Sequence, residues 1–227
     1  MPHDGPNSRQ DAHFDAWAQF LVSRAYAVLQ PQFRGSSGYG ARHVDAGRFK
    51  WGLEMQNDLT DGVQHLVANG TVNAAKVCIL GQGYGGYAAM AGLAFNRELY
   101  RCGISINGIA DLPTWVDYWR RRGVAYLGAG KFWHEFVGDP VANKERLVAT
   151  SPLRSVNGID APLLLMHATQ NTRVPIGQSK AMLYAMRAAQ RPVEFVELPD
   201  DNAELVRAAS NKRALREIEA FLSKHLR

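Results

Sequence analysis

The sequence predicts an α/β fold in which a mainly parallel sheet carries helices on both faces, and three observations support this. Short apolar segments alternate along the chain with longer segments of helical periodicity. The 227 residues suit one domain with a substantial core, so we expect a single domain over residues 1–227. Hydrophobic residues make up 46% of the chain and charged residues 21%, which is ordinary for a globular protein.

The apolar and periodic segments predict the individual elements in order. Strands are expected near residues 26–31, 77–81, 102–107, 162–167 and 193–198. Helices are expected near residues 13–24, 54–69, 84–95, 178–189 and 211–225. Residues 111–150 read as an irregular segment, and its aromatic residues are Trp115, Tyr118, Trp119, Tyr126, Phe132 and Trp133. We expect these aromatic side chains to form a loop cluster packed on the core.

The charge pattern and the cysteines narrow the class of protein. The net charge is +5, but the only dense basic run is residues 120–122, which is more typical of a solvated face than of a nucleic-acid surface. No apolar run reaches the length of a membrane span. Cys78 and Cys102 lie in predicted strands, where we expect buried small side chains without a disulfide. These features favour a cytoplasmic protein with neither nucleic acid nor membrane as partner.

Residues 76–92 form an apolar strand, a glycine-rich turn and a helix of small residues. This is the context of a nucleophile elbow, G-x-S-x-G, in which a sharp turn exposes a serine hydroxyl above the sheet. Gly81 and Gly85 keep the pattern, but the central position is Gly83, so the hydroxyl is absent. No serine lies between Ser37 and Ser105 that could take its place.

The same glycines allow a second interpretation, a nucleotide-binding turn. Gly81, Gly83 and Gly86 spell G-x-G-x-x-G after a strand, the dinucleotide fingerprint. That fingerprint needs an acidic residue about twenty positions later, at the end of the next strand. The expected strand at 102–107 ends without one, and Asp111 follows several residues too late. Nucleotide binding is therefore the weaker alternative.

Several segments carry a resemblance to a known family, and they are residues 2–6, 26–40, 51–63, 151–153 and 162–175. In these segments the chain resembles the catalytic α/β-hydrolase domain of the prolyl oligopeptidase family, in its acylaminoacyl-peptidase-like branch. The resemblance implies an ancestral serine-dependent hydrolysis of peptides or acyl-peptides, and it implies that residues 111–150 line the substrate side. The family has further strands and a β-propeller before the segment at 2–6, so the chain resembles a catalytic domain that lacks them. An unpaired sheet edge would then favour self-association.

The resemblance also places the catalytic triad of the family on three residues of this chain. Serine, aspartate and histidine each lie on a loop after a strand in α/β-hydrolases, and the matching positions are Gly83, Asn171 and Ala203. No histidine lies between His167 and His225 that could replace the missing base, and we interpret His167 as structural. The resemblance therefore predicts no catalytic residue at the triad positions.

The expected oxyanion site is altered as well. The backbone N–H of Tyr84 is one predicted donor, and Asp4 replaces a glycine of the family beside that site. A carboxylate there would repel the negative charge that develops during acyl transfer. The histidines show no metal-ligand spacing, so neither a metal nor a cofactor is expected. We expect an inactive domain with a vestigial cleft for peptides or acyl-peptides, the alternative being an active hydrolase with an unrecognised nucleophile.

Overall fold

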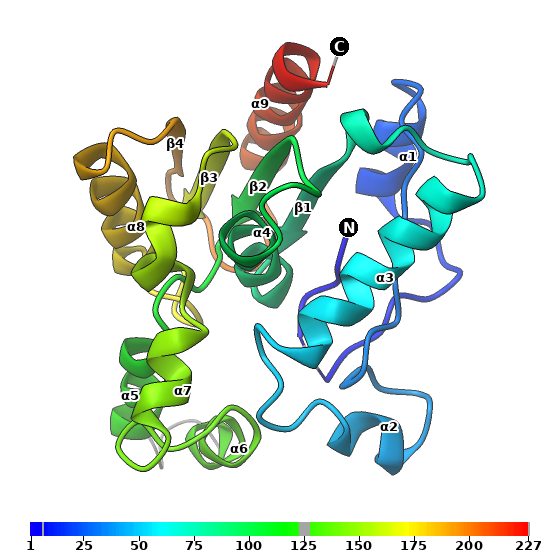
Figure 1. Ribbon diagram of the computed structural model, residues 1–227. Helices are drawn as coiled ribbons and strands as arrows, with labels where there is room; N and C mark the ends of the chain where they lie inside the picture. The colour runs from blue at the N-terminus through cyan, green and yellow to red at the C-terminus, as the bar shows by residue number, and fades with distance from the viewer. Residues whose placement is uncertain (6, 123–127, 227) are drawn as a thin grey trace.

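The computed structural model describes residues 1–5, 7–122 and 128–226. Its centre is a parallel sheet of four strands in the order β1-β2-β3-β4 (Figure 1). The strands are β1 Cys78–Gln82, β2 Cys102–Ile106, β3 Leu163–Ala168 and β4 Val193–Leu198. The predicted α/β class and four of the five predicted strands are confirmed.

The helices cover both faces of this sheet. On one face lie α3 (Glu54–Ala68), α4 (Tyr84–Phe95) and α8 (Gly177–Ala188), and on the other lie α1 (Ala16–Val22) and α9 (Ala208–His225). Figure 1 shows α4 end-on against β1 and β2. Successive side chains of a strand point to opposite faces of the sheet. On β3, Leu163 and Leu165 therefore belong to the buried cluster that includes α4, while Leu164 and Met166 belong to the cluster that includes α9.

The expected strand at residues 26–31 is wrong, because this segment pairs with no strand of the described sheet. Its polar groups bond to the N-terminal part of the chain instead. The amino group of Met1 donates to the carbonyl oxygen of Leu29 at 2.7 Å, and the Gln30 amide donates to the Asp15 carboxylate at 2.7 Å. An apolar segment becomes a strand only where a partner supplies the ladder. β1 is therefore an edge strand of the described sheet, and self-association through such an edge stays a prediction.

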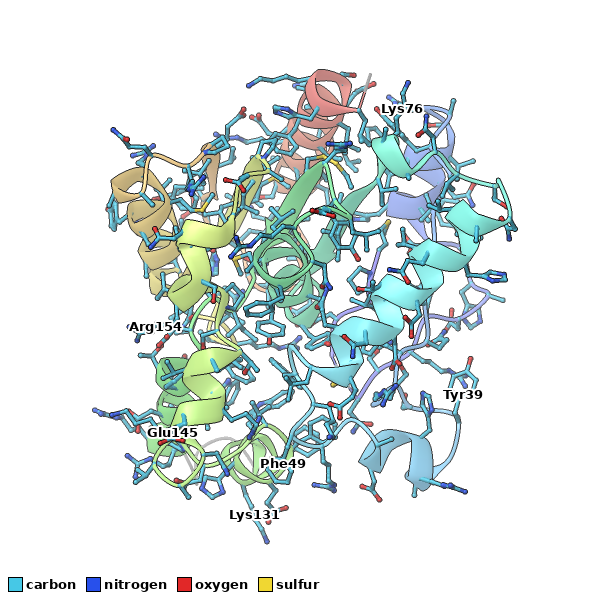
Figure 2. All side chains as sticks on the ribbon, viewed as in Figure 1. Tyr39, Phe49, Lys76, Lys131, Glu145 and Arg154 are labelled. Carbon is cyan, nitrogen blue, oxygen red and sulfur yellow. A yellow bond between two sulfur atoms is a disulfide. The ribbon has the colours of Figure 1, made fainter. Side chains whose placement is uncertain are left out.

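The expected irregular segment at residues 111–150 is also wrong, because its described residues contain three α-helices. They are α5 (Leu112–Arg122), α6 (Ala129–Phe136) and α7 (Lys144–Ala149), and they gather beyond the end of the sheet (Figure 1). Lys131 on α6 and Glu145 on α7 are exposed and point away from the body of the protein (Figure 2). Trp115 and Trp119, one turn apart on α5, are both buried, whereas Tyr118, Phe132 and Trp133 are half-buried. Tyr126 lies outside the described residues.

Three short elements complete the described chain. Helix α2 spans Ala41–Asp45, and two 3₁₀ helices, η1 and η3, span Ala74–Lys76 and Pro152–Gly158. None of the described helices combines the length and the apolar character needed to cross a membrane.

The cysteine prediction is wrong, because a disulfide joins Cys78 to Cys102. The two residues lie directly opposite each other on β1 and β2, with their Cα atoms 4.8 Å apart. The register that brings them together depends on how the two strands pair, and spacing along the chain does not reveal it. Disulfides persist in oxidising compartments, so the cysteines no longer support the expectation of a cytoplasmic location.

Candidate functional site

The turn between β1 and α4 has the sharp geometry that the sequence pattern indicates. Gly83 adopts φ +55° and ψ −114°, a region that residues with side chains rarely occupy. Its N–H donates to the carbonyl oxygen of Ile106 at 2.9 Å, and its own carbonyl oxygen accepts from the N–H of Tyr87 at 3.0 Å. The turn is thus fixed between the sheet and the helix, but its central residue carries no side chain.

The neighbouring glycines have a packing role. A Cβ atom on Gly81 would lie 2.6 Å from the Cα atom of Gly85, and one on Gly86 would lie 2.8 Å from the Cα atom of Gly108. A Cβ atom on Gly85 would overlap the carbonyl oxygen of Pro2. Only glycine allows such close approach of strand, turn and helix. The glycine pattern is therefore required by packing, without any nucleotide.

The Asp4 carboxylate lies in the space above Gly83. A Cβ atom on Gly83 would overlap Oδ1 of Asp4 and lie 2.5 Å from its Cγ. Oδ1 accepts hydrogen bonds from the N–H of Tyr84 at 2.9 Å and from the N–H of Gly5 at 2.8 Å. The carboxylate thus binds the N-terminus of α4, where unpaired N–H groups favour negative charge. The donor that the sequence predicts for an oxyanion is already occupied by Asp4.

The surroundings of this carboxylate act on its pKa in two directions. Neighbouring protein atoms crowd the carboxyl, and this desolvation raises the pKa of Asp4 above its usual value. The hydrogen bonds from Tyr84 and Gly5 lower it in turn. The residue as a whole remains exposed to solvent, which limits the effect of desolvation.

Asn171 follows β3 and is held by the backbone of its own loop. Its Oδ1 accepts from the N–H of Arg173 at 2.9 Å and from the N–H of Val174 at 3.0 Å. Its Nδ2 is buried and has no acceptor among the described residues. The site therefore offers two donors to residue 171 and leaves the amide donor unpaired, which is an arrangement that suits a carboxylate better than an amide.

Ala203 lies in the loop that follows β4. The Asp201 carboxylate organises this loop by accepting hydrogen bonds from three of its backbone N–H groups. The carbonyl oxygen of Ala203 accepts from the side-chain amides of Gln82 and Asn107, which ties the loop to the ends of β1 and β2. The loop is thus positioned beside the turn, but the methyl group of Ala203 can neither accept nor donate a proton.

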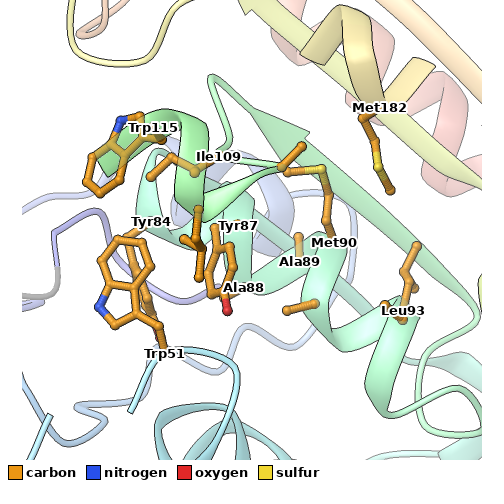
Figure 3. Packing of buried hydrophobic residues seen from close by; sticks show 14 of the residues in the cluster. Trp51, Tyr84, Tyr87, Ala88, Ala89, Met90, Leu93, Ile109, Trp115 and Met182 are labelled. Atoms are coloured by element: carbon orange, nitrogen blue, oxygen red, sulfur yellow. The ribbon is translucent and has the colours of Figure 1, made fainter. Parts of the chain in front are cut away.

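The three positions that match the triad line one pocket together with Asp4 and Tyr84. The pocket has a volume of about 280 Å³, and four tryptophans also line it: Trp51, Trp115, Trp119 and Trp133. Figure 3 shows Trp51, Tyr84 and Trp115 grouped beside α4. Among the described residues no histidine lines this pocket, so no base faces Gly83.

The four tryptophans that line the pocket form an aromatic wall, which was only partly predictable from the sequence. The Trp51 ring stacks on the Trp115 ring with centroids 5.6 Å apart, and the indole N–H groups of Trp115 and Trp119 donate to the carbonyl oxygen of Arg173 at 3.0 and 3.2 Å. The aromatic content of residues 111–150 pointed to this wall. Trp51 comes from a distant loop, and no pattern in the sequence linked it to the others.

His167 has a structural environment, as interpreted from the sequence. It is fully buried, its Nε2 donates to the carbonyl oxygen of Val174 at 2.9 Å, and its Nδ1 accepts from the Ser179 hydroxyl at 2.7 Å. Burial lowers the pKa of His167 to about 4. The neutral imidazole joins the loop after β3 to α8 and takes no part in lining the pocket.

The sequence of residues 12–227 matches the model of the prolyl oligopeptidase family. The chain belongs to the prolyl oligopeptidase family. It is 34% identical to dipeptidyl aminopeptidase BIII of Pseudoxanthomonas mexicana over 238 residues, which cover 100% of this chain and 33% of that protein. It is 30% identical to dipeptidyl peptidase family member 6 of Caenorhabditis elegans, over 100% of this chain and 30% of that protein. The chain therefore spans about a third of the length of these two relatives.

Solved structures of the family share the fold. A puromycin-hydrolyzing peptidase of Mycobacterium tuberculosis superposes with a TM-score of 0.90 at 24% identity, over 99% of this chain and 33% of that one. An acylaminoacyl peptidase of Pyrococcus horikoshii superposes with a TM-score of 0.88 at 26% identity, over 99% of this chain and 36% of that one. The α/β-hydrolase fold and the resemblance to the acylaminoacyl-peptidase-like branch are confirmed.

Proposed function

We propose that this domain is a member of the prolyl oligopeptidase family without hydrolytic activity, and that its pocket binds part of a peptide or acyl-peptide. The observation that supports the proposal most strongly is the position of Asp4. Its carboxylate takes the space of a nucleophilic side chain at residue 83 and occupies the N–H of Tyr84. One side chain therefore obstructs two parts of the hydrolytic machinery.

Serine-type hydrolysis needs a nucleophile, a base and donors for the oxyanion. In this pocket the nucleophile position is Gly83, the base position is the methyl group of Ala203, and the acid position is the amide of Asn171. These changes occur on a framework that otherwise keeps the turn and both loops in place. The combination supports a protein that folds like a peptidase but binds without cleaving.

The two alternatives have less support. The only hydroxyl on the described lining belongs to Tyr84, and burial raises its pKa well above the usual value, so the phenol stays neutral and is a poor nucleophile. Nucleotide binding would require free N–H groups at the glycine-rich turn. The Tyr84 N–H is bonded to Asp4, and the carboxylate would repel a phosphate.

Serine-directed fluorophosphonate labelling tests the proposal. We expect no covalent labelling of the chain and no measurable turnover of peptide or ester substrates. The matched control is the variant that combines Gly83→Ser, Asn171→Asp, Ala203→His and Asp4→Gly, which we expect to be labelled at residue 83. Stoichiometric labelling of the unmodified chain would contradict the proposal and favour an unrecognised nucleophile.

The order in which activity returns gives a second test. Triad members act as a unit, so each single restoration is expected to leave the chain inactive. The triple variant that keeps Asp4 is also expected to be inactive, because the serine side chain and the Asp4 carboxylate would overlap. Ester hydrolysis by the triple variant equal to that of the quadruple variant would show that Asp4 does not obstruct the site.

A further inference from the structure

The pocket combines a carboxylate with an aromatic wall. Oδ1 of Asp4 is saturated by the N–H groups of Tyr84 and Gly5, whereas no donor of the described residues is bonded to Oδ2. Asp4 itself lines the pocket. One oxygen of the carboxylate is therefore held in place by the backbone, and the other is left to a ligand.

The charge of the lining favours a cation. Asp4 and Arg173 are the charged residues among the described lining, and the Arg173 guanidinium forms an ion pair with Glu204 at the rim. Both residues act on Asp4: Arg173 lowers the pKa of Asp4 and Glu204 raises it, so the ion pair offsets part of the attraction between Arg173 and Asp4. An anion would meet the negative charge of this carboxylate, and the two N–H groups nearest to it are already bonded to Asp4.

The aromatic wall begins at the residue that holds the carboxylate. The Tyr84 ring lies 4.7 Å from the Trp51 ring, measured between centroids. The Trp115 and Trp133 rings lie 5.0 Å from each other and 5.6 and 6.2 Å from Trp51. Aromatic rings attract organic cations through their π faces and also bind apolar groups.

We propose that this pocket binds a protonated amine that carries an apolar group, with the ammonium on Oδ2 of Asp4 and the apolar group against the tryptophans. The proposal rests on the proposed non-catalytic function, since a serine at residue 83 would displace the carboxylate. Asp4, which fills the space of a nucleophile at residue 83 and is bonded to the N–H of Tyr84, is then the group that binds the ligand. The amine can belong to a small molecule or to the N-terminus of a peptide, and the two have the same chemistry at Asp4.

Tryptophan fluorescence gives a direct test, because four of the five tryptophans in the chain line the pocket. The unmodified chain is titrated with phenethylammonium, with 2-phenylethanol as the neutral analogue and with 3-phenylpropanoate as the anionic one. We expect the amine to bind about tenfold more tightly than the alcohol, as one charged hydrogen bond provides, and the carboxylate to bind more weakly than both. Equal binding of amine and alcohol, preference for the carboxylate, or no binding of the amine would each overturn the proposal.

Asp4→Asn tests the role of the carboxylate, because the amide oxygen can still accept from Tyr84 and Gly5 while the charge is removed. We expect this variant to lose about tenfold in affinity for the amine and to keep its affinity for the alcohol. Asp11→Asn, which removes an exposed carboxylate outside the pocket lining, is the matched control and should bind both ligands like the unmodified chain. An unchanged amine affinity in Asp4→Asn would overturn the assignment.

Phe-Gly-amide and its N-acetylated form distinguish the two sources of the amine. Tighter binding of the free peptide than of phenethylammonium would identify a peptide N-terminus, and weaker binding would identify a small amine; both support the proposal. Equal binding of the free and acetylated peptides would overturn it. The proposed lack of hydrolytic activity is tested separately, by fluorophosphonate labelling.

Discussion

Gly83→Ser is expected to destabilise the protein although it restores the residue of the family. The serine would have to adopt φ +55° and ψ −114°, which costs about 1–3 kcal/mol for a residue with a side chain. Replacing glycine returns about 0.5–1 kcal/mol through the unfolded chain. The new Cβ would overlap Oδ1 of Asp4, so the carboxylate must leave its two N–H donors.

Displacement of the Asp4 carboxylate determines the coupling free energy between residues 83 and 4. Hydrogen bonds to a charged acceptor are worth roughly 1.5–3 kcal/mol each, but Asp4 is exposed and water replaces most of that, which leaves about 1 kcal/mol for the pair. The total loss for Gly83→Ser is therefore about 2 kcal/mol. In an Asp4→Ala background the clash is absent, and the same substitution should cost about 1 kcal/mol.

Urea titration of the four proteins of this double-mutant cycle measures both quantities. Gly83→Ala serves as the control, because it adds the same Cβ without a hydroxyl and should lose about as much stability as Gly83→Ser. A serine variant as stable as the unmodified chain would refute the strain argument. Strictly additive losses in the cycle would refute the overlap with Asp4.

Three further predictions follow from buried groups. The pKa of His167 is lowered to about 4 from an unfolded value of about 6.5, so the unfolded state takes up a proton first as the pH falls. The free energy of unfolding should therefore be highest above pH 6.5 and should be about 2 kcal/mol lower at pH 5. Urea titrations at pH 7 and pH 5 should show this loss, and His167→Gln should show less of it. Asn171→Asp keeps both backbone hydrogen bonds and removes an unpaired buried donor. At pH 7 its free energy of unfolding should therefore equal that of the unmodified chain or exceed it by up to about 1 kcal/mol. A clear loss of stability would mean that desolvation of the new charge dominates. Alkylation without reduction should leave Cys78 and Cys102 unmodified in mass spectra, and alkylation of both thiols would disprove the disulfide. The double alanine variant should lose about 3.5 kcal/mol in the free energy of unfolding, the loop-closure value for a separation of 24 residues.

The sequence predicted those parts of the fold that depend on local pattern. The strands of the sheet are apolar runs bounded by turns, and the strand–glycine–helix order of residues 78–95 follows from composition and periodicity alone. Residues 26–31 have the same apolar pattern, but whether they form a strand depends on a partner elsewhere in the chain. Helix α5 could have been predicted, because Leu112, Trp115, Val116 and Trp119 recur at helical spacing and are buried.

The candidate site, too, was only partly predictable from the sequence. The resemblance placed Gly83, Asn171 and Ala203 after β1, β3 and β4, and parallel strands bring such positions to one edge of the sheet. The bond from Tyr84 to Asp4 joins residues 80 positions apart, and no local pattern encodes its geometry. The sequence showed that Asp4 is unfavourable for catalysis, but only the structure shows that it fills the place of the missing side chain.

The disulfide between Cys78 and Cys102 has a mechanical consequence. The two cysteines flank the turn at Gly83 and the whole of α4, so the bond closes this part of the chain into a covalent ring. A force applied to the two ends of the chain passes through the sulfur atoms and bypasses the ring. The oxidised protein should therefore extend by roughly 80 Å less than the reduced one, the reach of about 24 stretched residues. The turn that anchors Asp4 lies inside the part that bears no load.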